Sequence, residues 1–209
     1  MFWLVVACAH TQVSSKVEPE DLAEIPPEQL YELRDEEQAQ VAARGSLDAA
    51  QRDELRAANE VERAEAQVEA AEADVRAAKA EIDAANANRD GVRLDAARRT
   101  LILAEQDETV ARALVDWKRA ALREAEARTA EAEALVDLRL AETEMARVEL
   151  LGRDGTDEGY VVSEFIQQLA ATRETWERAR SRTRERAVEA EEARREYERA
   201  HAGQAVGTR

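Results

Sequence analysis

The chain has 209 residues, of which 36% are charged and 4% are aromatic, and its formal net charge is −16 at pH 7. This acidic balance argues against binding to nucleic acid or to anionic lipid, because both need clustered cations. So few aromatic residues provide little material for a globular core. The abundance of Ala, Glu, Arg and Leu instead predicts long helices in an all-α protein. No apolar stretch approaches the roughly 20 residues of a membrane-spanning helix.

The chain begins with an apolar, truncated signal-like segment, residues 1–7, which is followed by its single cysteine, Cys8. The sequence Val5-Val6-Ala7-Cys8 resembles the lipobox of bacterial lipoproteins. In that family the preceding segment is removed and the cysteine carries acyl chains. The resemblance implies lipid attachment at Cys8 and a periplasm-facing location, and Ala9 in place of aspartate points to the outer membrane. The alternative is a cytoplasmic protein with one free thiol.

The prolines of the chain all lie before residue 28, at Pro19, Pro26 and Pro27. Residues 8–27 therefore predict a lipid-anchored tether, which would reach roughly 60 Å at full extension. Pro27 suits the first turn of a helix, and we expect a short amphipathic helix over residues 28–44. A coiled-coil domain over residues 45–202 follows, and Ser46 is placed to cap its first helix.

A seven-residue repeat runs through that first helix of the coiled-coil domain, residues 46–88. Its d positions are alanine at every step from Ala50 to Ala85, and its a positions are mostly apolar from Leu47 to Ile82. Such a stripe is the seam of a coiled coil, and small side chains let the partner backbone approach closely. We therefore expect a tightly packed antiparallel neighbour.

The repeat resumes at Leu94, twelve residues after Ile82. This offset rotates the seam by roughly 120° around the helix axis. Turn-forming residues fill the interval 86–91, so we expect a break there and a second long helix over residues 92–151. The alternative is one continuous helix whose two halves face different partners.

The second long helix carries another apolar stripe, about 100° from the first. Because two stripes need two neighbours, we expect a third helix over residues 160–202, followed by a tail over residues 203–209. The predicted fold is a long antiparallel helical coiled coil with three main helices plus the short N-terminal helix. The second stripe is also the candidate partner-facing surface, formed by Leu103, Leu114, Trp117, Leu135 and Leu138.

Two sequence patterns partly resemble metal-binding sites, but each lacks required residues. Glu198 and His201 have the E-x-x-H spacing of di-iron bundles, but such a site needs a second copy and the only other histidine is His10. The segment 152–159 lacks the ligand order of a calcium loop. We expect no catalytic, cofactor-binding or metal site, no enzyme activity and no small-molecule substrate.

These patterns predict an envelope lipoprotein that serves as a structural spacer or scaffold. Its partners would be the membrane, through Cys8, and an envelope protein or a second copy, through its helices. The alternative is a periplasmic transport adaptor or chaperone-like helical hairpin protein. A chaperone should expose apolar surface at its helix tips, whereas the segment around Gly155 is polar, so the sequence favours the scaffold.

Overall fold

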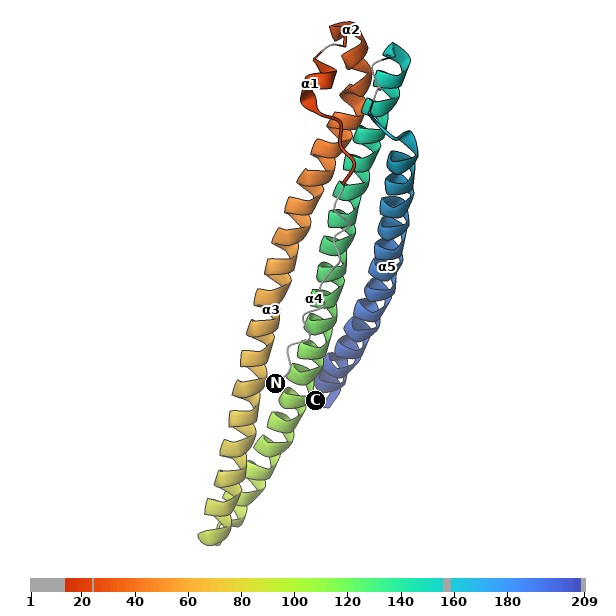
Figure 1. The fold of residues 1–209 in the computed structure, drawn as a ribbon. Coiled ribbons are helices and arrows are strands. Elements are labelled where there is room, and N and C mark those ends of the chain that lie inside the picture. The colour runs from red at the N-terminus through yellow and green to blue at the C-terminus, as the bar shows by residue number, and fades with distance from the viewer. Residues whose placement is uncertain (1–13, 24, 156–158, 208–209) are drawn as a thin grey trace. The chain divides into compact units, whose positions relative to one another are not determined.

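The structure is a computed structural model that describes residues 14–23, 25–155 and 159–207. These residues form helices and no strand, which confirms the predicted all-α fold. The elements in chain order are α1 (Pro19–Leu22), α2 (Pro27–Leu30), the 3-10 helix η1 (Tyr31–Leu33), α3 (Arg34–Ala87), α4 (Gly91–Asp154) and α5 (Val162–Gly207) (Figure 1). Among the helices described, none is both long enough and apolar enough to span a membrane.

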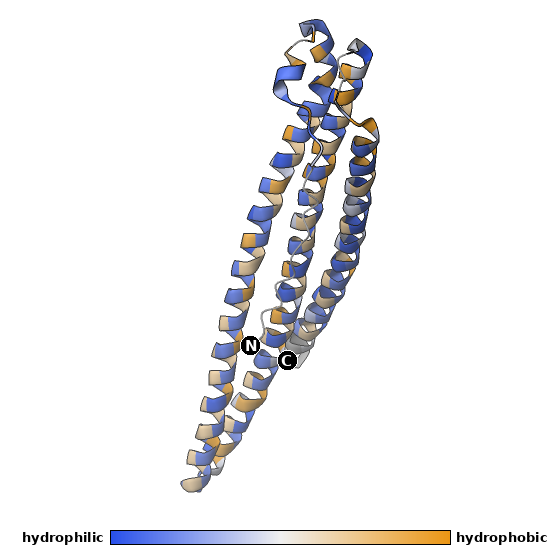
Figure 2. Ribbon diagram, viewed as in Figure 1, coloured by the Kyte–Doolittle hydropathy of each residue, from blue (hydrophilic) through white to orange (hydrophobic). Residues whose placement is uncertain are grey.

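The chain divides into two compact units, and each long helix contributes to both. Unit 1 consists of residues 1–51 and 127–183, and unit 2 consists of residues 52–126 and 184–209. In both units, apolar and polar residues alternate around each long helix, so that none of them is apolar on all sides (Figure 2). This is the pattern of amphipathic helices, which bury their apolar stripes and leave their polar residues to the solvent.

In unit 2, α3 and α4 pack as antiparallel partners. The end of α3 lies beside the beginning of α4, and earlier residues of α3 lie beside later residues of α4. Four ion pairs follow this course: Glu60–Lys118 (2.7 Å), Glu65–Arg119 (2.7 Å), Glu72–Arg112 (3.2 Å) and Glu81–Arg93 (2.5 Å). The alanine d row faces α4 here and is buried at Ala64, Ala71, Ala78 and Ala85. Short side chains at these positions let the two backbones lie close together.

The turn between α3 and α4 lies within the interval where the sequence predicted a break. The last turn of α3 closes through Arg89, which adopts a left-handed conformation with φ of 53°. Asp90 then caps α4, because its Oδ1 accepts the N–H of Arg93 at 3.0 Å. The continuous-helix alternative is therefore wrong.

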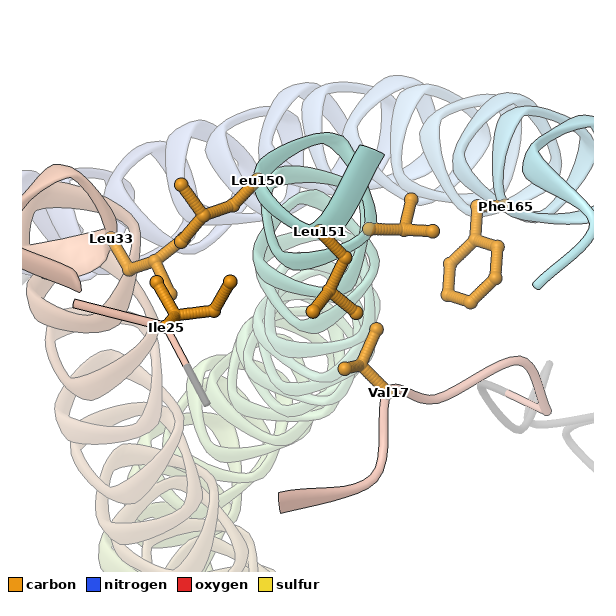
Figure 3. Close-up of a cluster of buried hydrophobic side chains, with 7 residues drawn as sticks. Val17, Ile25, Leu33, Leu150, Leu151 and Phe165 are labelled. Atoms are coloured by element: carbon orange, nitrogen blue, oxygen red, sulfur yellow. The ribbon is translucent and has the colours of Figure 1, made fainter. Parts of the chain in front are cut away.

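In unit 1, the core joins α4 and α5 to the segment that precedes α3. Val148, Leu150 and Leu151 at the end of α4 pack with Phe165 of α5, and this cluster is completed by Val17, Ile25 and Leu33 (Figure 3). Two contacts show that α4 and α5 run antiparallel: the Thr183 hydroxyl donates to the carbonyl of Ala127 at 3.1 Å, and Phe165 packs in one cluster with Leu151.

Two boundaries near the N-terminus differ from the prediction. The expected short helix over residues 28–44 is not separate, because α3 continues through Gly45, and Ser46 donates its hydroxyl to the carbonyl of Ala42 at 3.1 Å instead of capping a helix. A single glycine costs a helix only about 1 kcal/mol, which packing along the helix offsets. The prediction of a tether over residues 8–27 is also wrong for the described part of this range. Val17 and Ile25 are buried in the core and do not belong to an extended, solvated segment.

The ends of the other two long helices also differ from their expected limits. α4 covers residues 91–154 instead of 92–151, and α5 covers residues 162–207 instead of 160–202. The expected tail over residues 203–209 is therefore helical as far as Gly207. A heptad pattern identifies the buried stripe of a helix but does not specify the residue at which the helix ends, which explains these differences.

Candidate functional site

The predicted lipid attachment residue, Cys8, lies outside the described residues. The chain is described from Ser14, and residues 14–23 contact Glu144 of α4, Gln168 of α5 and Tyr160, which precedes α5, in unit 1. We call residues 14–23 the N-terminal clasp.

The main chain of the N-terminal clasp forms hydrogen bonds with side chains of α4 and α5. The N–H groups of Ser14 and Ser15 both donate to Oε1 of Gln168, at 2.7 and 2.9 Å, and Nε2 of Gln168 donates to the Ser15 carbonyl at 3.2 Å. The N–H of Val17 donates to the carboxylate of Glu144 at 2.8 Å. These polar contacts satisfy backbone groups that an irregular segment would otherwise expose or leave unpaired.

Tyr160 forms a further attachment point at the beginning of the clasp helix α1. Its hydroxyl donates to the carboxylate of Asp21 and accepts the N–H of Glu18 at 2.9 Å. The hydrogen bond to Asp21 raises the pKa of Tyr160, because ionisation of the phenol would remove the donor and place two negative charges together. The ring also packs edge-to-face with that of Phe165, with 6.1 Å between the ring centroids.

Beneath the clasp, a buried carboxylate is held by an arginine. Glu144 is only 3% exposed, and Arg147 donates to it at 2.9 Å. The same guanidinium donates to Glu37 of α3 at 3.3 Å. Removing one member of such a network leaves a buried charge without compensation, which is costlier than losing an exposed ion pair.

The candidate partner-facing residues do not form one open surface. In unit 1, Leu138 is 4% exposed and Leu135 is half-buried. In unit 2, Leu114 is half-buried, and Trp117 stacks on Tyr197 of α5 with 5.3 Å between ring centroids, while Leu103 is 44% exposed. The structure therefore places most of this stripe against neighbouring helices of the same chain.

A different surface in unit 1 remains open between α3 and α5. We call it the acidic groove. It is lined by residues from three helices: Asp35, Glu36 and Ala39 from α3, Arg139, Glu142, Met145, Ala146 and Glu149 from α4, and Leu169 from α5. Its apolar residues form a half-buried floor, whereas its carboxylates outnumber its single guanidinium.

The charges of the acidic groove are only partly compensated. Arg139 pairs with Glu142 at 2.7 Å, and Arg173 lies 3.8 Å from the same carboxylate. Glu36 differs, because its Oε2 atom is buried and has no hydrogen-bond partner among the described residues. An unsatisfied carboxylate oxygen is unfavourable and favours contact with a cationic donor.

Glu198 and His201 both lie on α5 but contact different residues. Glu198 lies 3.4 Å from Arg194, and the His201 ring lies 5.9 Å from that of Tyr197. Within the described part of the chain, no three side chains of His, Cys, Asp and Glu are grouped closely enough to hold a metal ion.

Sequence patterns did not identify the residues that hold the clasp. Glu144 follows the seam residue Thr143, where the heptad predicts a solvent-facing side chain, yet it is buried by the clasp. Gln168 and Tyr160 lie more than a hundred residues from the segment that they bind. Their roles depend on contacts between distant segments, which a local repeat does not record.

Comparison with known proteins gives no relative: no protein-family model, no curated protein and no solved structure matches this chain.

Proposed function

We propose that this protein is a lipid-anchored component of the bacterial envelope that acts as a structural spacer or scaffold through its helices. The observation that carries the proposal is the lipobox-like sequence Val5-Val6-Ala7-Cys8. Acyl chains contribute about 0.8 kcal/mol per buried CH₂ to membrane binding. The net charge of −16 opposes adhesion to anionic lipid, so attachment would depend on Cys8.

The scaffold part of the proposal is supported by the helices. α3, α4 and α5 contain 54, 64 and 46 residues and present charged residues along their exposed faces. Such surfaces are well suited to lateral contacts with other helices. The turn at the end of the α3–α4 hairpin is polar and exposed at Asn88, Arg89 and Asp90. Val92, in the first turn of α4, is 84% exposed beside it, but a single valine is little apolar surface for a chaperone that grips apolar clients at its tip.

Metabolic labelling with palmitate tests the anchor. We expect the wild-type chain, expressed in bacterial cells, to incorporate the label and to sediment with membranes. Cys8→Ala should abolish the label and release the protein, because no second acylation site remains. Ala9→Ser, which leaves the cysteine in place, is the matched control and should retain both properties. An unlabelled wild type, or label that persists in Cys8→Ala, contradicts the proposal.

A further inference from the structure

We propose that the acidic groove of unit 1 is the docking site for one amphipathic helix of a partner protein, with Lys or Arg on both sides of its apolar face. The inference rests on the proposed scaffold function and names the chemistry of the partner. Ala39, Met145 and Leu169 belong to three different helices and are half-buried, so a helix laid in the groove would contact all three. This is the common helix-in-groove mode of recognition.

The charges along the groove determine which kind of helix fits. Asp35, Glu36 and Glu149 line it and form no ion pair with the described residues. Carboxylates just outside the groove are compensated, since Glu37 lies 3.3 Å from Arg147 and Glu32 lies 2.7 Å from Arg153. The groove therefore carries uncompensated negative charge beside its apolar floor. A basic helix would match this potential, whereas an acidic helix would be repelled.

Glu36 provides a specific contact for such a helix. Its buried Oε2 atom lacks a hydrogen-bond donor, although the side chain lines the groove. Rotation of the side chain toward the opening would let the ammonium of a lysine or the guanidinium of an arginine supply that donor. Hydrogen bonds between ionised partners are roughly twice as strong as those between neutral groups.

The groove is not the place where the chain's own N-terminal clasp binds. The clasp contacts the stripe of α4 that carries Glu144 and Val148, whereas the groove uses the stripe with Met145 and Glu149. Adjacent residues of a helix point about 100° apart, so these stripes face different directions. A second copy is disfavoured as the occupant, because two chains that each carry a charge of −16 repel one another.

A synthetic peptide tests the proposal directly. The probe is a fluorescein-labelled helix of about three heptads, with Leu at its a and d positions and Lys at e and g. Its binding to the full-length, unlipidated chain is measured by anisotropy at low and at high salt. We expect saturable binding that weakens with salt, and no binding by the same peptide with Glu in place of Lys.

Matched variants distinguish binding at the acidic groove from general attraction of the peptide to the negatively charged protein. Glu36→Gln with Glu149→Gln should weaken binding by about 3- to 20-fold, as expected for two ion pairs at a partly exposed surface. Glu62→Gln with Glu69→Gln removes the same charge from exposed positions on α3 in unit 2 and should change the affinity little. Ala39→Arg, which places a cation on the groove floor, should abolish binding. Circular dichroism verifies that each variant is folded.

Three results would overturn the proposal. The first is equal weakening by the two double variants, and the second is equal binding of the Lys and Glu peptides. The third is a dimer in sedimentation that dissociates on Glu36→Gln with Glu149→Gln, which would assign the groove to a second copy. Because the chain is used without lipid, a failure here leaves the palmitate experiment unaffected, and a failure of labelling at Cys8 leaves this test unaffected.

Discussion

Individual side chains fix the N-terminal clasp by satisfying its backbone. The amide of Gln168 bonds to both Ser14 and Ser15, and Glu144 accepts the N–H of Val17. None of these contacts could be predicted from the sequence, because residues 14–23 show no periodicity and their partners lie on distant helices. Pro27 was predictable as the first residue of a helix, and α2 begins there, because the ring fixes φ and the missing N–H is unneeded at that position.

Tyr160 should make the stability of unit 1 sensitive to high pH. Its neutral phenol donates to Asp21, and its folded-state pKa is raised above the value of about 10 expected in the unfolded chain. The contribution is therefore complete below about pH 10 and is lost as the pH rises through the raised folded-state pKa. The measurement is the free energy of unfolding in urea for the wild type and for Tyr160→Phe, at pH 8 and at pH 11.

The wild type should exceed Tyr160→Phe in stability at pH 8, and the difference should shrink at pH 11. Tyr31→Phe is the control, because the Tyr31 side chain is 65% exposed and should show no such dependence. A difference between wild type and Tyr160→Phe that stays constant from pH 8 to pH 11 would show that the hydrogen bond to Asp21 contributes nothing.

At the scale of the elements, heptads predicted the buried stripes but not every boundary. The alanine row of α3 is buried as expected because small side chains at a seam permit close backbone approach. The turn at residues 88–90 was predictable because a change of seam direction coincides with Asn, Asp and Gly. The predicted helix boundary at Gly45 is wrong, because α3 continues through this residue. A glycine ends a helix only where tertiary packing does not stabilise the helical conformation.

Gly45 provides a direct test of the continuity of α3. A Cβ atom added there meets no atom within 4 Å, so Gly45→Ala should stabilise the protein by about 0.5–1 kcal/mol. Gly155→Ala should instead destabilise it, because Gly155 has φ of 75°, which alanine adopts only at a cost. Urea denaturation of the two variants against wild type gives both values. A destabilising Gly45→Ala would indicate that the helix is interrupted at this residue.

At the scale of the whole molecule, the two apolar stripes of α4 explain why it has helical neighbours in both units. The sequence predicted that one stripe would face α3 and the other a third helix, which agrees with the buried alanines of α3 and with the stacking of Trp117 on Tyr197. It could not show how much of the second stripe would remain uncovered, because coverage depends on where α5 lies. One open surface in unit 1 is the acidic groove, which none of the five predicted partner-facing residues lines.

Trp117 distinguishes an internal packing role from an interface role for the second stripe. Its indole stacks on Tyr197, and the ammonium of Lys118 lies 4.1 Å from the ring centroid. Trp117→Ala should destabilise the monomer by about 2–3 kcal/mol, less than the 3–5 typical of a fully buried tryptophan because Trp117 is half-buried. Ile102→Ala, at a side chain that is 55% exposed on the same helix, should cost little stability.

Thermal melts give the stabilities, and sedimentation gives the association state, which should be the same for both variants and the wild type. If Trp117→Ala leaves the melting temperature unchanged but dissociates a complex, the stack with Tyr197 is dispensable and the indole belongs to an interface.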